Sequence, residues 1–137
     1  MTHVTHLFPV RVYYEDTDHG GVVYYANYLK FMERARTEFL RDAGLELDAL
    51  EREFGVLFAV TEAHLRYMRP ARFNDLLHVE SSLVHLRGAR LAFAQRIVRD
   101  GALLVEGDIR LACIGRDGRA RRIPRPVLAR IRPEASE

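Results

Sequence analysis

The chain has 137 residues, of which 48% are hydrophobic and 29% are charged, and its formal net charge at neutral pH is +2. This balance predicts one globular domain over residues 1–137, and so small a charge without a recognition motif argues against a nucleic-acid-binding protein. No basic segment precedes a long apolar stretch near the N-terminus, and no window approaches the ~20 apolar residues that span a bilayer. We therefore expect an unexported, cytoplasmic protein without a transmembrane segment.

The first half of the chain predicts a short strand, then a loop, then a long helix. Alternating apolar residues over 10–15 indicate the strand. Residues 15–21 combine acidic residues, a threonine and two glycines, a composition typical of a loop. Apolar residues at helical spacing predict a helix from about residue 24 to 43, with Gly44 in its left-handed C-terminal cap. A shorter helix is expected over 48–53.

In the second half the apolar period changes to two, which predicts a series of antiparallel strands. Asp100-Gly101 is a strong signal for a two-residue hairpin between two of them. The last run places Leu103 and Val105 on one apolar face. The four runs cover residues 56–70, 77–83, 91–97 and 103–113.

This order of elements predicts a two-layer α+β domain with its core over about residues 8–126. The long helix has a single broad apolar face, and a curved antiparallel sheet of about five strands wrapped around it would bury that face. Pro124 and Pro126 limit a last short strand, and a terminal helix is expected over 127–132. The sheet has edges that need cover or pairing, so we expect dimers in which two sheets join edge to edge.

The loop before the long helix carries the residues best suited to chemistry. Asp16 and Asp18 stand two residues apart, and either one taken alone would most simply cap the helix. However, Gly20 and Gly21 let the backbone turn tightly and approach a ligand, and the helix start offers unpaired N–H groups and a positive dipole end. A carboxylate beside such donors predicts an acyl-transfer site, in which the donors hold an oxyanion and the carboxylate attacks or activates water.

Other catalytic classes find little support. His19 could act as a base, although a histidine in such a loop more simply orients its neighbour or is solvated. The remaining histidines lack metal-ligand spacing, and no Cys/His cluster indicates zinc. No serine-hydrolase elbow, P-loop or dinucleotide fingerprint is present. The single cysteine, Cys113, lies in an apolar run, which favours a buried, reduced thiol over a catalytic one.

Residues 10–28 read VRVYYEDTDHGGVVYYANY and residues 33–38 read ERARTE. These two stretches strongly resemble the YbgC-type acyl-CoA thioesterases, which belong to the 4-hydroxybenzoyl-CoA thioesterase branch of the hot-dog superfamily. The resemblance is specific in Asp-x-Asp, Gly-Val-Val-Tyr, Ala-Asn-Tyr and Glu-Arg-Ala-Arg. It continues more weakly through residues 69–72, 86–88 and 95–98.

The resemblance implies a hot-dog fold, an acyl-CoA substrate, no metal or other cofactor, and dimers that often pair into homotetramers with the active site between subunits. It also implies Asp18 as the catalytic acid, acting as nucleophile or general base. The Tyr25 backbone amide would polarise the thioester carbonyl, with Gly21 and Val22 beside the substrate. Many members carry histidine where this chain has Tyr25, and a small residue where it has His19; the backbone N–H survives this change and an imidazole role does not.

Arginine has to supply most of the attraction for the phosphates of coenzyme A, because Lys30 is the only lysine. The predicted contacts are Arg87 and Arg90, in a strand connection, and a later set around Arg119 and Arg121. The simpler interpretation is that these side chains are solvated.

Two other functions compete with hydrolysis. A hot-dog dehydratase would need a histidine paired with an acid, and His19 is the only nearby candidate. A binding or scaffolding module for acyl-carrier or envelope-maintenance partners would show no turnover. Incubation with a panel of acyl-CoAs, with detection of free thiol, distinguishes these alternatives from a thioesterase.

Overall fold

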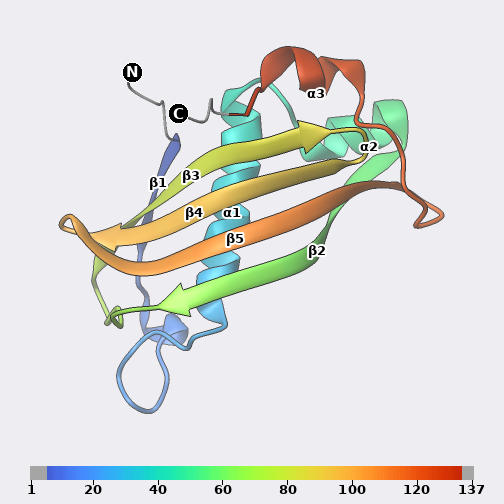
Figure 1. The fold of residues 1–137 in the computed structure, drawn as a ribbon. Helices are drawn as coiled ribbons and strands as arrows, with labels where there is room; N and C mark the ends of the chain where they lie inside the picture. Colours follow the sequence, from blue (N-terminus) through green and yellow to red (C-terminus); the bar gives the residue numbers. More distant parts are fainter. Residues whose placement is uncertain (1–5, 134–137) are drawn as a thin grey trace.

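Five antiparallel strands form one twisted sheet, and the long helix α1 lies across one of its faces (Figure 1). The computed structural model describes residues 6–133. The strand order in the sheet is β1-β3-β4-β5-β2, so β1 and β2 are the two edges. In chain order the elements are β1 (His6–Arg11), a 3-10 turn (Tyr14–Asp16), α1 (Asn27–Asp42), α2 (Leu47–Phe54), β2 (Val56–Tyr67), β3 (Leu76–Arg87), β4 (Arg90–Arg99), β5 (Ala102–Gly115) and α3 (Arg125–Arg130).

The core lies between α1 and the inner face of the sheet, as the apolar periodicity predicted. Helix α1 buries Phe31, Met32 and Ala35, which meet alternate residues of the strands, including the fully buried Phe93 and Ile109. The helix packs mainly against β1 and β3. At the other edge, most of β2 beyond its first residue is exposed, so one side of α1 is left open along this strand. Within residues 6–133, no helix combines the length and apolar character needed to cross a membrane.

Two predicted glycine positions are confirmed. Gly44 follows the end of α1 with φ of +82°, the left-handed conformation that a C-terminal cap requires. Asp100 and Gly101 both have positive φ between β4 and β5, as expected for a two-residue hairpin of the primed type.

The predicted first strand was placed too late in the chain. The strand is His6–Arg11, whereas residues 14–16 form a 3-10 turn. The Asp16 carboxylate accepts the N–H of Tyr13 at 2.8 Å, and this local bond stabilises the turn in place of further extension. Val12 is still buried, because its N–H donates to the Asp75 carbonyl beyond the strand end.

The start of the long helix was also wrong by three residues. Tyr24 to Ala26 form a turn, and α1 begins at Asn27. The Tyr24 N–H donates to the Asp16 carbonyl, and the Asn27 N–H donates to the Tyr24 carbonyl. A contact with the preceding loop therefore replaces the first predicted helical turn.

Three differences concern the C-terminal half. Ile97 faces Val105 and Val98 faces Leu103, so Leu104 is the extra residue of a bulge and is fully buried, whereas Leu103 is half-buried. A bulge shifts the alternation by one residue, which the periodicity could not reveal. The predicted last strand is reduced to one isolated bridge between Ile114 and Ala120. The terminal helix is Arg125–Arg130 rather than 127–132.

Candidate active site

The Asp18 loop, residues 17–23, is closed by its own backbone. Asp18 donates its N–H to the Val22 carbonyl at 2.8 Å and accepts the Gly21 N–H on its own carbonyl at 3.0 Å. Thr17 and Val23 pair as an isolated bridge. Gly21 has φ of +80° with open space where a Cβ would stand, so glycine is needed there for the backbone and not for packing. The loop projects beyond the sheet next to the first turn of α1 (Figure 1).

Only one oxygen of the Asp18 carboxylate is hydrogen-bonded within the described residues. Its Oδ1 accepts the Gly20 N–H at 2.8 Å. The side chain is exposed, and Oδ2 has no hydrogen-bond partner within residues 6–133. Neither aspartate caps α1, because the helix begins at Asn27 and its first turn has no side-chain cap. Asp18 is thus an oriented carboxylate with one oxygen available to a ligand, and Asp16 is the residue that orders the loop.

Asn27 ties the loop to the helix. Its Nδ2 donates to the Asp16 carbonyl at 2.9 Å, the same oxygen that accepts the Tyr24 N–H. The distance between the Asp18 carboxylate and the start of α1 is therefore set by bonds on Asp16. Asn27 lies in the Ala-Asn-Tyr motif, but no role was predicted for it from the sequence; its place at a loop-to-helix junction was the available signal.

Segment 69–72 supports the loop from the other side. The Val23 N–H donates to the Ala71 carbonyl at 2.9 Å, and the Ala71 N–H donates to the buried Tyr28 hydroxyl at 3.0 Å. Val22 also pairs with Arg72 in an isolated bridge. Val22 is consequently half-buried and held in place, while Arg72 is exposed next to the loop.

The turn before α1 presents backbone donors. Neither the Tyr25 N–H nor the Ala26 N–H has an acceptor among the described residues. Both lie at the helix N-terminus, where the peptide dipoles add up to a positive partial charge. The Tyr25 side chain is 60% exposed. The free N–H group of Tyr25 lies where the sequence predicts the oxyanion site, and this role stays a prediction.

Tyrosine side chains surround this turn. The Tyr25 ring packs edge-on against Tyr67 of β2, and these two residues with Tyr28 line a cavity of about 240 Å³ at the start of the helix. Burial raises the pKa of Tyr28 above its usual value. Burial likewise raises the pKa of Tyr67. Their phenols therefore stay protonated at neutral pH and cannot serve as general bases. His19 is exposed and makes no hydrogen bond with Asp18 in the described part of the chain.

The predicted phosphate contacts lie at the other end of the molecule. Arg87 ends β3, a strand of twelve residues, so it lies roughly 35 Å from the strand end beside the Asp18 loop. The Gly88 carbonyl accepts the Ile123 N–H at 2.9 Å, which places the segment carrying Arg119 and Arg121 beside this hairpin. The two predicted arginine sets thus come together, but far from Asp18 of the same chain.

Arginines that the prediction passed over lie closer. Arg72 is exposed and pairs with Val22 through the backbone. Arg69 is exposed in the same segment, which borders the cavity at Tyr25. The Arg-Pro-Ala-Arg stretch was noticed in the sequence as part of the family pattern, but its proximity to the loop depends on long-range pairing. Within residues 6–133, no group of three or more His, Cys, Asp or Glu side chains is arranged to hold a metal ion.

Comparisons with known proteins identify the family of this chain. A family model described as the thioesterase-like superfamily matches residues 12–131. The acyl-CoA thioesterase YbgC of Haemophilus influenzae is 45% identical over 107 residues, which are 78% of this chain and 79% of that protein. The acyl-CoA thioester hydrolase YbgC of Escherichia coli is 46% identical over 108 residues, 78% of this chain and 80% of that protein. The crystal structure of a probable thioesterase from Bartonella henselae is 38% identical and has a TM-score of 0.85, covering 88% of this chain and all of that one.

Proposed function

The chain belongs to the thioesterase-like superfamily and is a hot-dog acyl-CoA thioester hydrolase, and we propose that it hydrolyses its substrate with the Asp18 carboxylate. One observation carries this proposal: within the described residues, Asp18 Oδ2 and the N–H groups of Tyr25 and Ala26 have no hydrogen-bond partner. The Asn27 bond to the Asp16 carbonyl connects the loop that carries Asp18 to the start of α1. This arrangement supplies the two elements that acyl transfer needs, a carboxylate and preorganised oxyanion donors.

The geometry supports a simple sequence of events. The thioester carbonyl oxygen accepts a hydrogen bond from the Tyr25 N–H, which stabilises the negative charge that develops on it. Asp18 then either attacks the carbonyl carbon, giving an acyl-aspartyl anhydride that water opens, or removes a proton from an attacking water. In both routes coenzyme A leaves as its thiolate and is protonated from solvent. Gly21 leaves open space where a side chain would stand, and the pairing of Val22 with Arg72 holds the loop in place.

We further propose that the working form is a dimer, and that dimers pair into tetramers. The outer edge of β2 is unpaired within the described residues, and exposed strand edges favour pairing with a second chain. The Asp18 carboxylate is exposed in the single chain, so a second subunit would supply the missing wall of the site. Light scattering should show an oligomer at micromolar concentration; a stable monomer with full activity would contradict this interface.

Coenzyme A phosphates then have two candidate partners. Arg69 and Arg72 lie near the Asp18 loop of the same chain, and Arg87 and Arg90 can approach it only from another subunit. Loss of the contacting pair should raise KM for the CoA ester without a matching effect on a short thioester that lacks the nucleotide. Double alanine variants of each pair, assayed on both substrates, identify the pair involved; equal effects on both substrates would assign a structural role.

The test of the catalytic assignment is Asp18→Asn, with Glu15→Gln as its matched control. Both changes remove one negative charge from an exposed side chain near the same loop. With a panel of acyl-CoAs and detection of free thiol, Asp18→Asn should lose turnover by on the order of a hundredfold or more, and Glu15→Gln should keep it. Near wild-type turnover in Asp18→Asn would remove the assignment, and binding of acyl-CoA without turnover in the wild type would favour the scaffolding alternative.

We propose the cytoplasm as the location. Cys113 is buried and unpaired, as expected in a reducing compartment. Burial raises the pKa of the Cys113 thiol, so this cysteine is not a nucleophile.

A further inference from the structure

Arg36 is the only charged side chain that is buried among the described residues, with 8% of its surface exposed. Its Nη1 donates to Gln95 Oε1 at 3.0 Å. Gln95 in turn donates from Nε2 to the Met32 carbonyl at 3.0 Å and to Ser81 Oγ at 2.9 Å. Both N–H groups of the Gln95 amide are used in these bonds, so its oxygen is fixed toward Arg36 and holds the guanidinium in place without neutralising its charge.

The remaining guanidinium nitrogens of Arg36 have no partner in the part of the chain that the structure describes. No carboxylate lies within ion-pair distance of Arg36 in the described part of the chain. Glu33, one turn earlier, lines the same cavity, but its side chain is exposed. Apart from Nη1, the guanidinium nitrogens make no hydrogen bond within residues 6–133, yet they are not sealed in the protein interior. Burial lowers the pKa of Arg36, and the charge of nearby Glu33 raises it to a smaller extent, so the guanidinium remains charged at neutral pH. A buried charge without a directly hydrogen-bonded counter-ion is costly, so such a group normally has a partner.

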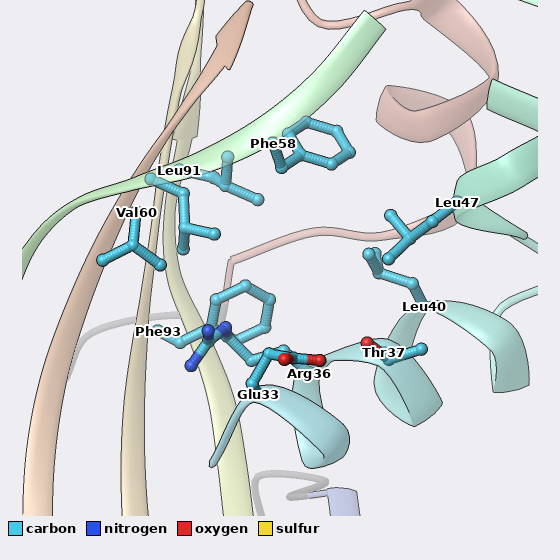
Figure 2. A pocket seen from close by; sticks show the side chains of 10 residues that line it. Glu33, Arg36, Thr37, Leu40, Leu47, Phe58, Val60, Leu91 and Phe93 are labelled. Carbon is cyan, nitrogen blue, oxygen red and sulfur yellow. The ribbon is translucent and has the colours of Figure 1, made fainter. Parts of the chain in front are cut away.

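Arg36 lines a cavity of about 270 Å³ between α1, α2 and β2 (Figure 2). Its other walls are mostly apolar and include Leu40, Leu47, Phe58 and Phe93. In Figure 2 the Arg36 and Glu33 side chains come from the α1 side, opposite Phe58 on β2. The volume lies below the roughly 300–1,000 Å³ of pockets that enclose a whole ligand, so the cavity suits one end of a longer molecule.

This cavity and the one at the start of α1 lie along the same side of the helix. The Arg36 cavity is bordered by Phe58 and Val60 near the beginning of β2, and the cavity at the start of α1 is bordered by Tyr67 near the end of this strand. Arg36 follows Asn27 by nine residues, which corresponds to about 13 Å along the helix axis. An extended acyl chain of roughly ten carbons, with bonds of ~1.5 Å in a zigzag, covers this distance.

We propose that this cavity binds the distal end of the acyl group and that Arg36 selects acyl groups ending in a carboxylate. The substrates would be mono-CoA esters of medium-chain dicarboxylic acids; this inference rests on the proposed thioesterase function. A carboxylate is planar and accepts two parallel hydrogen bonds from a guanidinium, and one cation balances one carboxylate. Glu33 is exposed to solvent at the rim, so its repulsion of the bound carboxylate is screened and weak.

The test compares pairs of CoA esters of equal length, one ending in a methyl group and one in a carboxylate, from six to twelve carbons. The quantity measured is the ratio of kcat/KM within each pair, by free-thiol release. The wild type should favour the carboxylate-terminated ester, most strongly near ten carbons. Arg36→Gln should lower this ratio by at least about tenfold, and Glu33→Gln should raise it. Arg34→Gln, the same charge change at an exposed position of the same helix, should leave it unchanged.

A second measurement, inhibition of the wild type by free acids, does not depend on whether the Arg36 variant folds. The free ten-carbon dicarboxylic acid should inhibit the wild type more strongly than the ten-carbon monocarboxylic acid does. A wild-type ratio that favours the methyl-terminated ester at every length, or a ratio that Arg36→Gln leaves unchanged, would overturn the proposal while hydrolysis itself stands. Absence of hydrolysis for every ester would instead overturn the proposed function.

Discussion

Replacing Asn27 with alanine should lower turnover far more than it lowers stability. The change removes one hydrogen bond of 2.9 Å, from Asn27 Nδ2 to the Asp16 carbonyl. That carbonyl still accepts the Tyr24 N–H, so it is not left unsatisfied. The cost in unfolding free energy should therefore be that of a single ordinary hydrogen bond, about 0.5–1.5 kcal/mol, and not the larger cost of an orphaned acceptor. For a chain of this size the melting temperature should fall by roughly 2–7 °C.

The effect on catalysis is amplified because the lost bond sets the position of the Asp18 loop relative to the Tyr25 N–H. A displacement of about 1 Å between catalytic groups can cost on the order of a hundredfold in rate, so kcat should fall by roughly 10–100-fold while KM changes little. Arg116→Ala is the matched control, since it also removes one 2.9 Å bond from a side chain to a backbone carbonyl, far from the loop.

Steady-state kinetics at saturating acyl-CoA and thermal unfolding, measured on the same preparations, check this expectation. Arg116→Ala should show a comparable or smaller stability loss with wild-type kcat. If Asn27→Ala retains kcat within a factor of about two to three, the Asn27 bond does not position the loop and the reasoning fails.

Three further changes test other parts of the structure. Leu104→Ala should lower the free energy of unfolding by about 2–5 kcal/mol, because Leu104 is fully buried at the bulge. Leu103→Ala should lower it clearly less, and equal losses in urea unfolding would contradict the bulge. Burial opposes ionisation of Asp75, but the backbone N–H and the Arg99 guanidinium outweigh it and lower its pKa. The stability from this pair is therefore present above the unfolded pKa of Asp75 and lost as pH falls through the lower folded value, so the deficit of Arg99→Gln should shrink on acidification below about pH 4. Tyr28→Phe leaves a buried N–H without its acceptor and should cost about 1–3 kcal/mol in thermal unfolding; a neutral result would indicate that water replaces the hydroxyl.

Much of the fold was predictable because it depends on local patterns. The period-two runs, the hairpin at Asp100-Gly101 and the Gly44 cap each reflect a conformational preference written within a few residues. The same local reasoning placed Asp16 and Asp18 in a loop with two glycines before a helix, near backbone donors, whereas Tyr25 was chosen only from the family resemblance; the roles of Asp18 and Tyr25 stay predictions. The family resemblance then narrowed the choice between the two aspartates.

The features that were missed depend on partners distant in the sequence. The start of α1 is shifted by hydrogen bonds to Asp16, and the burial of Leu104 follows from its pairing with β4. Arg36 had a readable signal: it lies four residues after Met32, on the buried face of the helix. A charged residue on an apolar stripe is rare enough to mark a special site, but only the position of Gln95 reveals what holds it.

The way in which the Asp18 loop is held also bears on how this family diversifies. Its shape depends on main-chain hydrogen bonds, one glycine with positive φ and two anchoring side chains, Asp16 and Asn27. The side chains of His19, Tyr24 and Tyr25 are exposed and take no part in those bonds. Mutation can therefore exchange them without moving the carboxylate. Substitutions at these three positions can thus change which substrates enter the site while the position of the Asp18 carboxylate is retained.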